Sequence, residues 1–104
     1  MGQTLMRADK EPGYFMVDSS TFFAERSKMK NLKVLFKGDP VLINIYHGMV
    51  TSPERHPQLN YGLAIKFMEF MASTEGQKIF REYGTLQFGT ALYNDAEYAG
   101  KWDK

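Results

Sequence analysis

The sequence predicts an α/β fold class, because short β-type segments alternate with helical segments along the chain. Three apolar segments rich in β-favouring side chains are expected to be strands: YFMV at 14–17, NLKVLF at 31–36 and VLINIYHGMV at 41–50. Helical spacing and capping signals predict helices around them. A chain of 104 residues with 43% hydrophobic and 24% charged residues suits one globular domain or one lobe of a larger protein.

The first elements are predicted from spacing and from punctuating residues. A short helix is expected over residues 2–11, ended by Pro12-Gly13, because apolar residues recur there at helical spacing: Met1, Leu5 and Ala8. After the first strand, Asp18, Ser19 or Ser20 opens a helix that continues to about Met29. The turn KGDP at 37–40 closes the second strand.

The C-terminal third, residues 60–104, is predicted to be mainly helical. Asn60 caps a helix that continues to about Ala72, with one apolar face formed by Ala64, Phe67, Met68 and Met71. Thr74 and Gln77 have the spacing of a capping box and start a second helix, and a last helical turn follows Asn94. These apolar helix faces exceed what three predicted strands can cover. We therefore expect a sheet from outside this chain, or a second copy of the chain, to cover them.

Composition excludes several classes of function. With 13 basic and 12 acidic residues, the net charge of +1 gives no electrostatic footprint for nucleic acid, and no polybasic patch for a membrane surface stands out. The lysines at 28, 30 and 33 are expected to form a solvated face. The absence of cysteine excludes disulfides, thiolate catalysis and thiolate zinc sites. His47 and His56 have no partner at metal-ligand spacing, and no nucleophile elbow or phosphate loop occurs. We expect a non-enzyme without cofactor or metal; a hydrolase is the weakest alternative.

The best candidate site is the hydroxyl cluster that follows the first predicted strand: Asp18, Ser19, Ser20 and Thr21. Small polar residues at the start of a helix either cap the helix or, with its unpaired backbone N–H groups, hold a small anion. Both interpretations stay open, and Asp18 would repel an anion unless it accepts hydrogen bonds from the helix. Nearby aromatic residues are expected in the core rather than on a stacking surface: Tyr14, Phe15, Phe22 and Phe23.

Several stretches together resemble a known family. MGQTLMRADKEPGYFMVDSSTFF is similar to the pattern MGxTLxxAxExxxYTLTDRGTYL, and NLKVLFKGDPVLINIYHGMV to LxVLxEGDPxLxNxYxVI. NYGLAIKFMEFMASTEGQKIFREYG is similar to NxxxAxxFxxWLxSPEGQxxIxxFG, and FGTALYNDA to xGxPLFxPDA. In this order they resemble the C-terminal part of extracytoplasmic solute-binding proteins of ABC transporters, of the tungstate/molybdate type with the type II periplasmic-binding fold.

This resemblance implies an architecture and a function. Residues 1–104 would form a single α/β lobe, the second lobe of a two-lobe protein, which is incomplete without the first lobe. Residues 41–50 would be the crossover strand, and the C-terminal helices at 60–104 would pack on the first lobe. The protein would bind a small anion, an oxyanion such as tungstate or molybdate, between the lobes in the periplasm and deliver it to a membrane permease.

The resemblance also assigns site residues. The family sequence TDRG aligns with residues 17–20, so Ser19 occupies the arginine position, and only hydroxyl and backbone donors remain there. Asp18, Ser19, Ser20 and Thr21 would form the second lobe's edge of the ligand cleft, with Tyr14 as a weaker neighbour. The alternative is a self-associating lobe that acts as an interaction or scaffold module and binds no ligand of its own.

Overall fold

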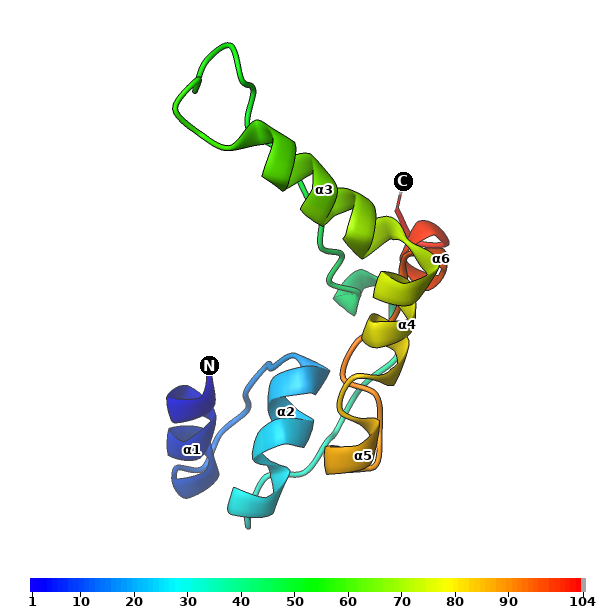
Figure 1. Ribbon diagram of the computed structural model, residues 1–104. Coiled ribbons are helices and arrows are strands. Elements are labelled where there is room, and N and C mark those ends of the chain that lie inside the picture. Colours follow the sequence, from blue (N-terminus) through cyan, green and yellow to red (C-terminus); the bar gives the residue numbers. More distant parts are fainter. Residues whose placement is uncertain (104) are drawn as a thin grey trace.

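The computed structural model describes residues 1–103 as short helices joined by turns and extended segments (Figure 1). The α-helices are α1 (Gly2–Lys10), α2 (Ser19–Glu25), α3 (Tyr61–Ala72), α4 (Thr74–Glu82), α5 (Thr85–Phe88) and α6 (Ala96–Gly100). Two 3₁₀-helices, η1 (Arg26–Lys28) and η2 (Pro40–Leu42), lie between α2 and α3. The predicted helices are therefore confirmed to within a few residues, and α5 is an addition that the sequence analysis missed.

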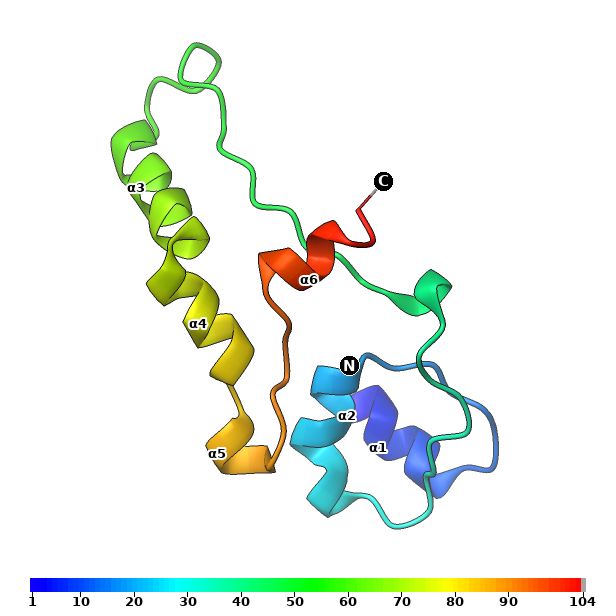
Figure 2. The same cartoon turned by 90° about the vertical axis from the view of Figure 1, so that its right-hand side faces the viewer.

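The molecule is elongated, with α1 and α2 at one end and α3 extending toward the other (Figure 1). α1 packs on α2, and α3 packs on α4. Figure 2 shows α3 and α4 along one side, the extended segment after η2 along the other, and α6 between them. The radius of gyration is 17.5 Å and the extents are 51 × 29 × 28 Å, whereas a compact domain of this length would have a radius of about 13 Å.

The three predicted strands do not form among residues 1–103, so the α/β class is not confirmed. Residues 14–17 and 32–36 lack regular structure. Val41 and Leu42 belong to η2, because the Asp39 carboxylate accepts a hydrogen bond from the Val41 N–H at 2.9 Å and starts a turn. A strand needs a neighbour for its backbone N–H and C=O groups, and the described part of the chain supplies none. The crossover role of residues 41–50 stays a prediction.

The hydrophobic core is small. Leu5 is the fully buried apolar side chain of the described residues, and it lies on the face of α1 that meets α2. Asp9, one helical turn further on the same face, is 9% exposed. A core of this size stabilises only the α1–α2 end of the molecule.

Much of the apolar surface of α3 is exposed. Of the predicted apolar face, Ala64, Met68 and Met71 are half-buried, but Phe67 is 59% exposed. Next to this face Leu63 and Phe70 are also exposed. A helix that is apolar on most of its circumference is normally buried on most sides. That a further surface covers these helices stays a prediction.

The elbow between α3 and α4 is fixed by the sequence STEGQ at 73–77. Ser73 caps α4, since its Oγ accepts a hydrogen bond from the Gly76 N–H at 3.1 Å. The predicted capping box at Thr74 and Gln77 is therefore wrong by one residue at the cap. Gln77 instead donates from Nε2 to the Met71 carbonyl at 2.6 Å and ties α4 to the end of α3. At Gly76 a Cβ would lie 2.2 Å from the Phe70 carbonyl oxygen, so only glycine fits.

The C-terminal segment is held to α4 by two polar contacts. The Gln77 Oε1 accepts a hydrogen bond from the Ala96 N–H at 2.6 Å, and Arg81 pairs with Asp95 at 2.8 Å. Asp95 also caps α6 by accepting from the Tyr98 N–H. The start of α6 is thus positioned by side chains of α4.

Candidate functional site

Asp18 is the N-cap of α2, and its carboxylate organises the predicted hydroxyl cluster. Its Oδ1 accepts from the Thr21 N–H at 2.7 Å and from the Ser20 hydroxyl at 2.5 Å, and its Oδ2 accepts from the Thr21 hydroxyl at 2.9 Å. Asp18 has extended backbone angles, as an N-cap residue usually does. The structure therefore brings Asp18, Ser20 and Thr21 together, and two of the three hydroxyls are occupied in capping.

Three donors of the cluster remain unused. The side chain of Ser19 is exposed, and no hydrogen bond to it is found within residues 1–103. The backbone N–H groups of Ser19 and Ser20 also have no acceptor among the described residues, as expected for the first helical positions. A small acceptor at this corner could receive hydrogen bonds from these donors without displacing the cap.

The charge of Asp18 is directed into the cap. Partial burial raises the pKa of Asp18, but hydrogen bonds from the Ser20 hydroxyl, the Thr21 N–H and the Thr21 hydroxyl together outweigh it and lower the pKa. The carboxylate is therefore ionised at neutral pH and accepts hydrogen bonds from the helix. Asp18 was expected to repel a nearby anion unless it accepted hydrogen bonds from the helix, and it does accept them.

Tyr14 does not join the cluster. Its side chain is 93% exposed, and no hydrogen bond connects it to Asp18 in the described part of the chain. The expectation that the neighbouring aromatics are core residues is wrong for Tyr14 and holds only in part for the others. Phe22 and Phe23 are half-buried and meet edge to face, with ring centroids 5.8 Å apart. Phe15 is 37% exposed.

The histidines lie apart from this corner. His47 Nε2 lies 3.0 Å from the Asp103 carboxylate and connects the extended segment to the residues after α6, while His56 is exposed in the loop before α3. Within residues 1–103 no three or more His, Cys, Asp or Glu side chains gather as metal ligands would. In the same range, no helix has the length and apolar character needed to cross a membrane.

Asp9 is a polar centre that the sequence analysis missed. Its Oδ1 accepts from the backbone N–H groups of Asn31 at 2.7 Å, Leu32 at 2.9 Å and Lys30 at 3.1 Å, and the Asn31 side chain donates to the Asp9 carbonyl at 2.7 Å. These hydrogen bonds, led by those from Asn31 and Lys30, lower the pKa of Asp9. The signal was present: an acidic residue four positions after Leu5 lies on the buried face of its helix and needs donors there.

Comparison with known proteins identifies two relatives. In an alignment 106 residues long, the chain is 32% identical to an ABC transporter anion-binding protein of Haloferax volcanii, and the alignment covers 94% of this chain. Over 93 residues it is 27% identical to the tungstate-binding protein TupA of Peptoclostridium acidaminophilum, which covers 89% of this chain. The predicted resemblance to ABC-transporter solute-binding proteins is confirmed. No protein-family model matches the sequence, and no solved structure matches it.

The similarity extends along nearly the whole chain but only part of each relative. The matched region is 31% of the Haloferax protein and 32% of the Peptoclostridium protein, so the chain spans about a third of their length. What the complete relatives bind is stated by their names alone, and its extension to this chain is a proposal.

Proposed function

We propose that the protein is a solute-binding component of an ABC importer that holds a small anion in a cleft between two lobes. The observation that carries this proposal is the similarity, over 94% of the chain, to an ABC transporter anion-binding protein. An oxyanion such as tungstate or molybdate is the proposed ligand, because the second relative is named for tungstate. The protein would work in the periplasm, or its extracytoplasmic equivalent, and deliver the anion to the permease.

The proposed ligand contacts lie at the corner where α2 begins. The hydroxyl of Ser19 and the free N–H groups of Ser19 and Ser20 would donate to the oxyanion, while Asp18 and Thr21 hold the corner in shape. Tyr14 is 93% exposed and has no hydrogen bond to the cap among the described residues, so it would be at most a weaker neighbour of the ligand. Neutral donors would replace the arginine that the resemblance leads one to expect at position 19.

The missing half of the cleft would come from a first lobe outside residues 1–104. In this proposal the first lobe covers the exposed faces of α3 and α4, where Leu63, Phe67 and Ile79 are each at least half exposed. It would also supply strands beside the extended residues 43–51, whose backbone groups find no strand partner within residues 1–103. Burying these surfaces would stabilise both lobes through the hydrophobic effect.

Calorimetry on the complete protein tests the proposed ligand and site together. Tungstate, molybdate and sulfate are titrated into the wild type and into the double variant Ser19→Ala/Ser20→Ala. We expect tungstate or molybdate to bind, and the double variant to lose up to about tenfold in affinity. It removes the Ser19 hydroxyl that would donate to the ligand, worth roughly 0.5–1.5 kcal/mol, and the Ser20 hydroxyl that holds Asp18 in the cap. The matched control is Ser27→Ala/Ser52→Ala, which removes two exposed hydroxyls elsewhere. Unchanged affinity in the Ser19/Ser20 variant overturns the site, and no binding of any oxyanion overturns the ligand class.

A second candidate function rests on the exposed face of α3. The chain would be an interaction or scaffold module that self-associates through Leu63, Phe67 and Phe70, and it would bind no ligand. Light scattering on the chain checks this: the candidate predicts a dimer or larger species that Phe67→Lys converts to a monomer. A wild-type monomer at high concentration contradicts it.

A further inference from the structure

A run of positive charge follows α2. Residues 26–38 contain five basic residues and no acidic residue: Arg26, Lys28, Lys30, Lys33 and Lys37. All five are exposed, and among the described residues Lys28 alone of the five forms an ion pair, with Glu25 at 2.6 Å. The net charge of +1 conceals this run, because acidic residues elsewhere in the chain balance it.

The other carboxylates at this end of the molecule do not neutralise the run. Asp9 accepts hydrogen bonds from backbone N–H groups and attracts the charge of Lys30. Asp18 and Asp39 each accept from their own caps. Glu11 pairs with Arg7 at 3.0 Å. The side chains of Arg26, Lys33 and Lys37 therefore present their charge to the surroundings.

Apolar side chains are interleaved with these cations. Between Lys33 and Lys37, Val34 is 54% exposed, Leu35 is 75% exposed and Phe36 is 68% exposed. Residues 29–39 contain no helix or strand. Residues 30–32 are anchored by Asp9, but residues 33–38 form no hydrogen bond to another element among the described residues. This stretch can therefore adapt to a fluid surface. Cations beside exposed aromatic and aliphatic side chains are typical of segments that lie at a membrane–water interface.

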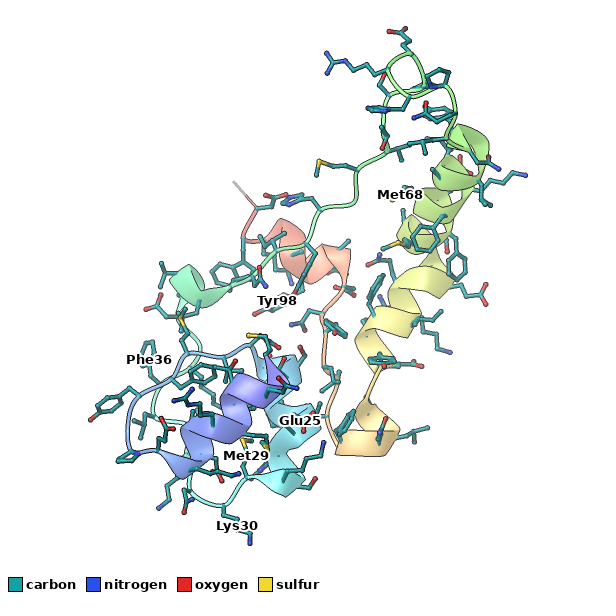
Figure 3. All side chains as sticks on the ribbon, turned by 90° about the vertical axis from the view of Figure 1, so that its left-hand side faces the viewer. Glu25, Met29, Lys30, Phe36, Met68 and Tyr98 are labelled. Atoms are coloured by element: carbon teal, nitrogen blue, oxygen red, sulfur yellow. The ribbon has the colours of Figure 1, made fainter. Side chains whose placement is uncertain are left out.

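We propose that residues 26–37 form a docking surface for membranes that contain anionic lipids. The basic side chains contact the lipid headgroups, and Leu35 and Phe36 enter the interface. This surface lies at the α1–α2 end of the molecule: Figure 3 shows Lys30 and Phe36 at that end and Met68 on α3 at the other. It is separate from the faces assigned above to a first lobe, and it does not depend on the proposed ligand.

Vesicle sedimentation with the full chain tests the proposal. One set of vesicles is pure phosphatidylcholine, and the other is an equimolar mixture of phosphatidylcholine and phosphatidylglycerol. We expect binding to the anionic vesicles alone, weakening as salt shortens the screening length from about 10 Å at 0.1 M to about 3 Å at 1 M. The triple variant Arg26→Gln/Lys33→Gln/Lys37→Gln should bind roughly a hundredfold more weakly. Phe36→Ser should weaken the binding that persists at high salt.

The control removes an equal number of positive charges from other parts of the molecule. Arg55→Gln/Lys66→Gln/Lys101→Gln also neutralises one arginine and two lysines, and all three are exposed and outside any ion pair in the described chain. It should keep wild-type vesicle affinity, with circular dichroism checking that both triple variants fold alike. Equal binding to both vesicle types overturns the proposal, as does equal loss in the two triple variants. If the wild type ignores all vesicles but binds poly-glutamate, the surface belongs to an acidic polypeptide instead, and the membrane assignment is overturned.

Discussion

The carboxylate of Asp9 accepts a hydrogen bond from the backbone N–H of Asn31 at 2.7 Å, across 22 positions of sequence. The same carboxylate binds the N–H groups on either side of Asn31. One side chain of α1 thus fixes the segment that follows η1. Together with the burial of Leu5, this contact forms the buried centre of the α1–α2 end of the molecule.

Asp9→Asn should release this segment. The amide can still accept one or two hydrogen bonds, but it lacks the charge, and hydrogen bonds to a charged group are the stronger kind. Hydrogen exchange at the N–H groups of residues 30–32 should become faster than in the wild type, and the melting temperature should fall. Glu11→Gln, which removes an exposed carboxylate from the same end of α1, is the control and should leave both readings unchanged. Unaltered exchange at 30–32 in Asp9→Asn would contradict the anchoring role.

Stability should fall in acid. The pKa values of Asp9, Asp18 and Asp95 are all lowered from 3.8 by hydrogen bonds formed in the folded state. A carboxyl with a lowered folded-state pKa contributes stability above its unfolded pKa and loses it as pH falls through the folded value. Urea unfolding should therefore give a free energy that is constant from neutral pH to about pH 5 and decreases below about pH 4. Asp18→Asn should lose less unfolding free energy in acid than the wild type. An equal loss would argue against the Asp18 cap as a source of the pH dependence.

Gly76→Ala should destabilise the α3–α4 elbow. The added methyl group would lie 2.2 Å from the Phe70 carbonyl oxygen and 2.9 Å from that of Met71, and both are backbone atoms that cannot rotate away. Overpacking of this kind costs about 1–3 kcal/mol of unfolding free energy. Gly62→Ala, inside α3 with only a side-chain oxygen at 3.9 Å, is the matched control. It should be neutral or stabilising by up to about 1 kcal/mol. Equal effects in denaturant titrations would contradict the steric argument.

Gln77→Ala should loosen α6 as well as the elbow. The side chain donates to the Met71 carbonyl and accepts from the Ala96 N–H, so both contacts vanish together. We expect a loss of about 1–2 kcal/mol in unfolding free energy and faster exchange of the Ala96 N–H. Gln87→Ala, at an exposed position of α5, serves as control. Protection of Ala96 that survives in Gln77→Ala would show that Arg81 and Asp95 hold α6 without it.

The sequence predicted the positions of the helices better than it predicted the α/β fold class. Asn60 caps α3 by accepting from the Leu63 N–H, and Gly84 follows α4 with a φ of +91° that favours glycine; both signals are local and were visible. The segments at 14–17, 32–36 and 41–50 have β-type composition, but a strand also requires a neighbour, and composition carries no information about that neighbour.

The candidate site was predicted only in part, because sequence spacing reveals contacts between residues close in the chain and not contacts between distant ones. The Asp18 cap depends on residues within three positions, so spacing revealed it. The role of Asp9 depends on a backbone segment more than twenty positions away, which no local pattern specifies. Gln77 was assigned to a capping box from its spacing, but its side chain instead meets the end of α3 and the start of α6.

The bridge made by Gln77 implies an order of assembly. Its side chain can hold the Ala96 N–H in place only after α4 has formed and turned against the end of α3. Residues 95–103 would therefore acquire their native position late, once the elbow exists to receive them. In refolding followed by pulsed hydrogen exchange, amides of α4 should become protected before the N–H of Ala96, and the reverse order would contradict this sequence of events.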